Sequence, residues 1–162
     1  MRKTIVASLA FISFAVAGSA QAQVQQFGPW KLAANGEACL ARYDSGSQRF
    51  EIMASTPTDG LISLTSDQTR GTADGTTQTM DMLWTFGTGQ EMDLAVSTTA
   101  SNDGLVFQTP MESGVKLLRY GPRVRLSRQG GATVFDLDLP DDGQTGQLFD
   151  AFDSCRAALD ED

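Results

Sequence analysis

Short segments in which apolar and polar residues alternate dominate the chain between its N-terminal apolar run and its C-terminal segment. Alternation with a period of two is typical of a strand that buries one face. Clusters of turn-forming residues separate these segments, as at Asp59–Gly60 and Asn102–Gly104, while Ser66–Gln78 is polar enough to suggest a mobile loop. The pattern predicts nine strands, at Trp30–Ala33, Ala38–Tyr43, Arg49–Ala54, Leu61–Thr65, Thr79–Phe86, Glu91–Ser97, Leu105–Thr109, Arg123–Ser127 and Thr133–Leu139.

Two of the expected hairpins have a register that follows from their turns. If Gly130–Gly131 is a two-residue turn, apolar residues face apolar residues and arginines face aspartates across the hairpin. The predicted facing pairs are Leu126 with Phe135, Val124 with Leu137, Arg125 with Asp136, and Arg123 with Asp138. A three-residue loop at Thr88–Gln90 similarly places Phe86 opposite Met92, Trp84 opposite Leu94 and Met82 opposite Val96.

One helix is expected after the last strand. Leu148, Phe152, Cys155 and Leu159 follow one another at helical spacing and form an apolar stripe. Many short strands followed by this helix predict a mainly β fold, an antiparallel β-sandwich of immunoglobulin-like or jelly-roll type with one C-terminal α-helix. A small closed barrel is the structural alternative.

The first residues have the pattern of an export signal. Met1–Lys3 is positively charged, Ile5–Ala17 is apolar, and Ala20 and Ala22 form a small-residue cleavage motif. We therefore expect a signal peptide at residues 1–22 and a single domain at residues 23–162. The apolar run is short for a transmembrane helix, so an uncleaved membrane anchor is the lesser alternative. The expected location is the periplasm or the extracellular medium of a bacterium.

Removal of the signal peptide changes the charge balance. Without Arg2 and Lys3, ten basic residues remain against twenty acidic ones, which gives the mature chain a net charge of −10. An acidic protein repels phosphate backbones and anionic membrane surfaces. Nucleic-acid binding and a membrane anchor after cleavage are therefore not expected.

Cys39 and Cys155 are the only cysteines. In an exported protein two cysteines most often form one disulfide, which here would join an early strand to the last helix. Closing so long a loop stabilises a fold by about 4–5 kcal/mol in the chain-entropy model. A reactive thiol is the alternative, but the chain has no histidine to activate it.

The absence of histidine also removes most familiar catalytic and zinc-binding arrangements. Asp44–Gly46 matches the triplet of aspartic proteases but lies where a hairpin needs a turn. Met80, Met82 and Met92 could bind Cu(I), although their alternation is typical of core residues. Asp141–Gly143 lacks the ligand density of a calcium loop. We expect no catalytic residues, metal or cofactor.

Basic residues concentrate in one segment. Half of the mature chain's positive charges lie between residues 116 and 128. The hairpin register pairs two of these arginines with aspartates and leaves Lys116, Arg119 and Arg128 without partners. These three are candidate residues for docking an acidic partner, phosphate or lipopolysaccharide, and a solvated surface is the plainer interpretation.

The chain resembles the invasion-associated locus B family, small exported bacterial proteins. The resemblance rests on Trp30, Cys39–Ala41, Ser113–Leu117, Gly130–Leu137 and a final helix that carries Cys155. It implies a β-sandwich with a C-terminal helix and a non-enzymatic role, linked in some members to host-cell invasion. The acidic segment before the helix is longer here than in the family pattern.

Gly28–Trp30 is also similar to the opening of lipocalin-like and protease-inhibitor barrels. Three functions therefore stay open. The first is an exported binding or interaction protein with a protein partner. The second is a barrel that inhibits a protease or carries a small ligand, and the third is a carboxylate-based hydrolase.

Overall fold

The computed structural model describes residues 23–159, and the predicted signal peptide lies outside them. Ten strands form one antiparallel sheet in the order β1-β2-β3-β4-β5-β8-β7-β6-β9-β10 within this part of the chain. The strands are β1 (Gln23–Phe27), β2 (Trp30–Ala34), β3 (Cys39–Ser45), β4 (Gln48–Ala54), β5 (Asp59–Thr65), β6 (Thr77–Thr85), β7 (Glu91–Ser101), β8 (Gly104–Pro110), β9 (Arg123–Arg128) and β10 (Thr133–Asp138). The helices are α1 (Met111–Tyr120) and α2 (Gly143–Ala157). The predicted mainly β fold with a C-terminal helix is confirmed.

All nine predicted strands are present, with ends that differ by a few residues. Two further elements, β1 and α1, were not predicted. Strand β1 lies at the sheet edge and is almost wholly exposed, so it has no alternation of apolar and polar residues. Helix α1 buries Met111, Val115 and Leu118 on one face, but Gly114 interrupts it and no side chain caps its start. Because its helix propensity is weak, the segment was not predicted to be a helix although it has an apolar stripe.

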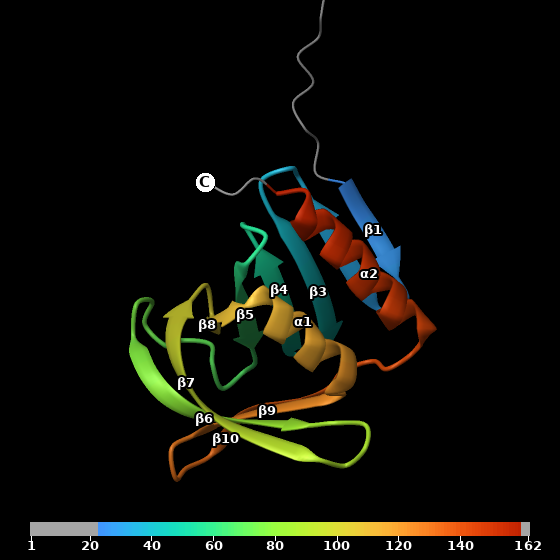
Figure 1. The fold of residues 1–162 in the computed structure, drawn as a ribbon. Coiled ribbons are helices and arrows are strands. Elements are labelled where there is room, and N and C mark those ends of the chain that lie inside the picture. The colour runs from blue at the N-terminus through green and yellow to red at the C-terminus, as the bar shows by residue number, and fades with distance from the viewer. Residues whose placement is uncertain (1–22, 160–162) are drawn as a thin grey trace, which may run out of the picture.

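Aromatic side chains pack in one core between two halves of the sheet, one formed by β1 to β5 and the other by β6, β9 and β10. Phe50 of β4 meets Trp84 of β6 edge to face, with ring centroids 6.5 Å apart. Trp30 of β2 packs against Phe149 of α2 at 5.9 Å. Figure 1 shows α2 lying along β1, β2 and β3, with α1 between α2 and the half formed by β6, β9 and β10. Large interlocking side chains therefore fill the space between the halves.

Helix α2 buries Leu148 and Phe152 of the predicted stripe completely, together with Phe149. The helix ends at Ala157, so Leu159 is buried beyond it, and Cys155 is half-buried. Asp142 caps the start of the helix by accepting a hydrogen bond from the Thr145 backbone N–H at 2.8 Å. This bond, a second from the Thr145 hydroxyl and one from the Gln144 N–H hold the pKa of the Asp142 carboxyl below its ordinary value, since they stabilise the charged form.

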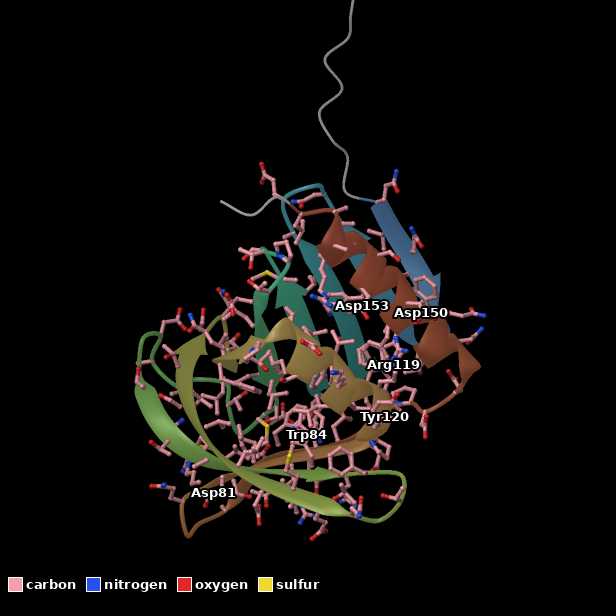
Figure 2. All side chains as sticks on the ribbon, viewed as in Figure 1. Asp81, Trp84, Arg119, Tyr120, Asp150 and Asp153 are labelled. Atoms are coloured by element: carbon pink, nitrogen blue, oxygen red, sulfur yellow. A yellow bond between two sulfur atoms is a disulfide. The ribbon has the colours of Figure 1, made fainter. Side chains whose placement is uncertain are left out.

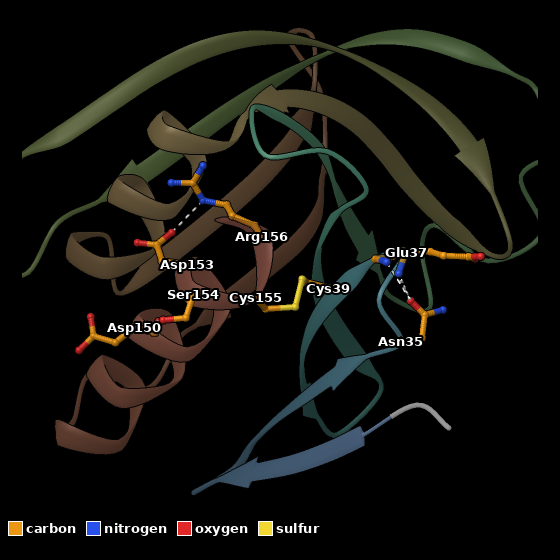
Figure 3. Close-up of a disulfide and its surroundings, with 9 residues drawn as sticks. Asn35, Glu37, Cys39, Asp150, Asp153, Ser154, Cys155 and Arg156 are labelled. Atoms are coloured by element: carbon orange, nitrogen blue, oxygen red, sulfur yellow. Dashed lines mark hydrogen bonds and ion pairs between the residues drawn. A yellow bond between two sulfur atoms is a disulfide. The ribbon is translucent and has the colours of Figure 1, made fainter. Parts of the chain in front are cut away.

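Cys39 and Cys155 form the predicted disulfide, with their Cα atoms 6.1 Å apart. Figure 3 shows the bond running from α2 to β3, close to Asp153 and Arg156. Arg156 donates to Asp153 at 2.9 Å and also to the Pro57 carbonyl in the loop between β4 and β5. The last helix is therefore tied to β3 by the disulfide and to the β4–β5 loop by the hydrogen bond from Arg156 to Pro57.

The hairpin of β9 and β10 has the predicted facing pairs, from Leu126 with Phe135 to Arg123 with Asp138. Its predicted two-residue turn is wrong, however, because Thr133 faces Ser127 and not its neighbour Arg128. A bulge at Val134 adds one residue to β10 and restores the predicted register beyond it.

The predicted register of β6 and β7 is wrong by two residues. Trp84 faces Met92, and Met82 faces Leu94. The loop is longer than expected, and the Phe86 N–H closes it by donating to the Gln90 carbonyl at 2.8 Å. A shift of two leaves every side chain on its original face, so the apolar pattern cannot distinguish the two registers.

The segment between β5 and β6, predicted to be a mobile loop, begins with a buried polar network. Ser66 and Thr69 are both 1 % exposed. The Ser66 hydroxyl donates to the Val134 carbonyl at 2.5 Å, and the Thr69 hydroxyl lies 2.8 Å from the Asp103 carbonyl. The same residues that suggested mobility therefore link this loop to the β7–β8 turn and to the β10 bulge.

Candidate functional site

The end of α1 carries two of the three predicted docking residues. Lys116 is exposed and Arg119 is half-buried, one turn apart on the same helix. Tyr120, the last residue of α1, is 63 % exposed, which makes it one of the few large exposed apolar side chains between residues 23 and 159. Figure 2 shows Arg119, Tyr120 and Asp150 on the side where α1 and α2 meet.

Two hollows flank Arg119 and Tyr120. The smaller, of about 180 Å³, lies between the helices and is also lined by Val115, Lys116 and Arg156. The larger, of about 540 Å³, opens toward the β6–β7 loop. Its other lining residues are Phe86, Gly87, Thr88, Gln90 and Asp141. Arg119 and Tyr120 line both hollows, and we call this region the helix-end surface.

Acidic neighbours compensate the basic side chains of the helix-end surface. Lys116 donates to Glu112 at 2.6 Å, and Arg119 donates across to Asp150 on α2 at 2.8 Å. The lysine's hydrogen bond and charge hold the pKa of Glu112 below its ordinary value. Each pair is exposed and contributes little stability. The surface is thus mixed in charge, and it lacks the uncompensated positive charge expected of a phosphate-binding or lipopolysaccharide-binding patch.

Arg128, the third predicted docking residue, lies away from the other two. Strand β9 starts at Arg123, just beyond the end of α1, and carries Arg128 at its opposite end beside the β9–β10 turn. Five residue steps along a strand span roughly 17 Å. Arg128 is exposed and forms no ion pair within the described residues. The structure therefore brings Lys116 and Arg119 together without Arg128.

The two other arginines of the basic segment both pair with aspartate, but Arg123 binds Asp136 more closely than its predicted partner Asp138, which lies 3.7 Å away. Arg123 donates to both carboxylate oxygens of Asp136, at 2.8 and 2.9 Å, and Arg125 donates to the same group at 3.2 Å. These hydrogen bonds, that from Arg123 first, hold the pKa of Asp136 below its ordinary value despite partial burial.

The residues considered for catalysis or metal binding lie in a charged hairpin and in the core. Asp44 accepts hydrogen bonds from Arg42 at 2.7 Å and from Arg49 at 3.1 Å, which lower its pKa, as expected for a charged hairpin residue. Met80 and Met82 are buried in the core, as their alternation predicted. Within residues 23–159 no three cysteine, aspartate or glutamate side chains lie close enough to hold a metal ion.

Sequence reasoning missed Tyr120 and Phe86, which complete the helix-end surface. Tyr120 has a detectable signal, because it ends an amphipathic stretch that begins with Met111. Phe86 was instead placed inside a strand and paired with Met92.

No helix in the described part of the chain is long and apolar enough to cross a membrane. Searches among protein-family models, curated proteins and solved structures found no match to this chain.

Proposed function

We propose that this protein is an exported, non-enzymatic binding protein that docks a protein partner on its helix-end surface. One observation carries the proposal: Tyr120 stands exposed beside Arg119 with a hollow on either side. Tyrosine and arginine are enriched among residues that dominate binding energy at protein interfaces. Hollows beside them offer pockets for side chains of the partner.

The chemistry of the surface favours a protein partner over a simple anion. Arg119 already pairs with Asp150, and Asp141 lines the larger hollow. Mixed charge with an aromatic centre is the composition of a protein interface. A buried core of Trp30, Phe50 and Trp84 counts against the lipocalin-like alternative, because a carrier needs interior space.

Export is supported by the signal-like N-terminal segment and by the disulfide, which persists in oxidising compartments. The resemblance to invasion-associated locus B proteins supports the same compartment and a role without catalysis. The absence of histidine limits an enzyme to carboxylate, lysine or arginine chemistry. Two of the available carboxylates, Asp44 and Asp136, are each held by two arginines.

The test is crosslinking in the native host with affinity purification of the tagged full chain. Tyr120→Ala removes the exposed ring, and Arg119→Glu reverses the neighbouring charge. Arg128→Glu is the matched control, since it makes the same charge change on an exposed arginine away from this surface. We expect a stoichiometric partner with the wild type and the control, and at least about a tenfold loss with Tyr120→Ala. Equal capture by all variants would contradict the proposal.

A further inference from the structure

Strands β7 and β8 separate soon after their turn. Asn102 and Asp103 both have positive φ, 50° and 68°, as in the two-residue turns of tight hairpins. Here pairing stops after three residue pairs, ending at Thr99 with Val106, although both strands continue. Beyond that point β7 follows β6, while β8 remains paired with β5 along its length.

The separation exposes two strand edges. The Ala100 N–H donates to Thr76 at 2.9 Å, and the Ala100 carbonyl accepts from Gly75 at 2.8 Å, so even-numbered residues of β7 bond toward β6. Antiparallel ladders alternate, so odd-numbered residues point their N–H and C=O toward β8. At Ala95 and Ser97 these groups meet no strand of the described chain. By the same alternation, the backbone N–H and C=O of Gln108 on β8 point into the gap from the opposite side.

The gap is a cleft of about 540 Å³, within the size range of ligand sites. Val96, Phe107 and Leu61 supply apolar walls. A neighbouring hollow of about 440 Å³ shares Leu61 and Val106 with the cleft and extends over the outer face of the sheet. Apolar walls beside free backbone donors and acceptors match an extended polypeptide, which presents both kinds of group in alternation.

We propose that this cleft binds an extended peptide segment of a partner protein, which adds as a strand along the free edge of β7. The segment is neutral or basic. The mature chain has a net charge of −10, and Asp93 on β7 and Asp59 beside the cleft are exposed. This site is separate from the helix-end surface, so it does not depend on the function proposed there.

The probe is a capped peptide of about seven residues, alternating valine and threonine between terminal lysines. It is titrated into isotope-labelled protein, and amide hydrogen exchange is followed by NMR. We expect protection of the Ala95 and Ser97 amides by at least about tenfold. Two further peptides carry N-methyl groups on alternate residues, one at the even positions and one at the odd positions; we call these the two peptide phases. Only the peptide whose N-methyl groups block the N–H donors that face β7 should lose binding.

Ser97→Pro removes one N–H that faces the cleft, and Val24→Pro is the matched control on the outer edge of β1. Proline is tolerated where the lost N–H makes no ladder bond. Ser97→Pro should weaken peptide binding at least tenfold, and the control should not. Three results would overturn the proposal: no protection at about 1 mM peptide, protection confined to β1 or β10, or equal affinity for both peptide phases. The last readout uses the wild-type protein and does not depend on how the proline variants fold.

Discussion

Loss of the disulfide should remove a large share of the fold's stability. The bond joins residues separated by 116 positions in sequence. In the chain-entropy model, a closed loop of that length restricts the unfolded chain enough to stabilise the fold by about 5 kcal/mol. Domains of this size are typically stable by about 5–15 kcal/mol. The double variant Cys39→Ala/Cys155→Ala should therefore retain its fold at low temperature but with a much smaller margin.

The assay is urea denaturation followed by tryptophan fluorescence, since Trp30 and Trp84 are both buried and report unfolding. We expect a free energy of unfolding lower by about 4–5 kcal/mol. The denaturant slope should rise, because an uncrosslinked unfolded chain exposes more surface. Wild-type protein kept reduced is the control and should match the double variant. A decrease in the free energy of unfolding below about 1 kcal/mol, with an unchanged denaturant slope, would refute this reasoning. Side-chain packing alone would then hold α2 against the sheet.

Four further predictions concern the core, a close backbone approach, a helix interior and a charged cluster. Trp84→Ala should cost about 3–5 kcal/mol in urea denaturation, since the indole is 1 % exposed at the centre of the core; a loss under about 1 kcal/mol would contradict that packing. Gly60→Ala should destabilise by about 1–3 kcal/mol, because its Cβ would lie 2.2 Å from the Met53 carbonyl oxygen. Gly146→Ala, inside α2 with open space around it, should instead stabilise by up to about 1 kcal/mol. Asp136 has a depressed pKa, so its contribution is present above the ordinary value of 3.8 and is lost as the pH falls through the folded-state pKa. Asp136→Asn should therefore lower stability at neutral pH and match the wild type in strong acid; a difference that persists there would contradict the assignment.

The sequence predicted the strands because alternation is a local pattern, and it predicted the disulfide because only two cysteines follow an export-like N-terminus. Alternation identified nine strands, and the register taken from a turn at Gly130–Gly131 matched the last hairpin because a bulge at Val134 offsets the longer turn. The loop length assumed for the β6–β7 hairpin was wrong, and the alternation could not correct it. The β6–β7 register moved by two residues, because Trp84 keeps the same face whether Met92 or Leu94 lies opposite.

The parts of the candidate site that were not predicted from the sequence depend on how elements distant in sequence pack together. Lys116, Arg119 and Arg128 are close in sequence, but the unpredicted helix α1 and the length of β9 separate the third from the others. The acidic partner Asp150 comes from another helix, so its pairing with Arg119 has no local signal. The β7–β8 cleft likewise depends on how far a hairpin ladder continues beyond its turn.

Site-specific photocrosslinking from position 120 in living cells tests the proposed docking role most directly. A photoreactive phenylalanine analogue replaces Tyr120, and the same analogue at Val24, which is 66 % exposed on β1, serves as the control. The proposed function predicts one dominant protein adduct from position 120 that is absent from position 24. If position 120 gives no adduct above the control, the helix-end surface is not where this protein binds a partner.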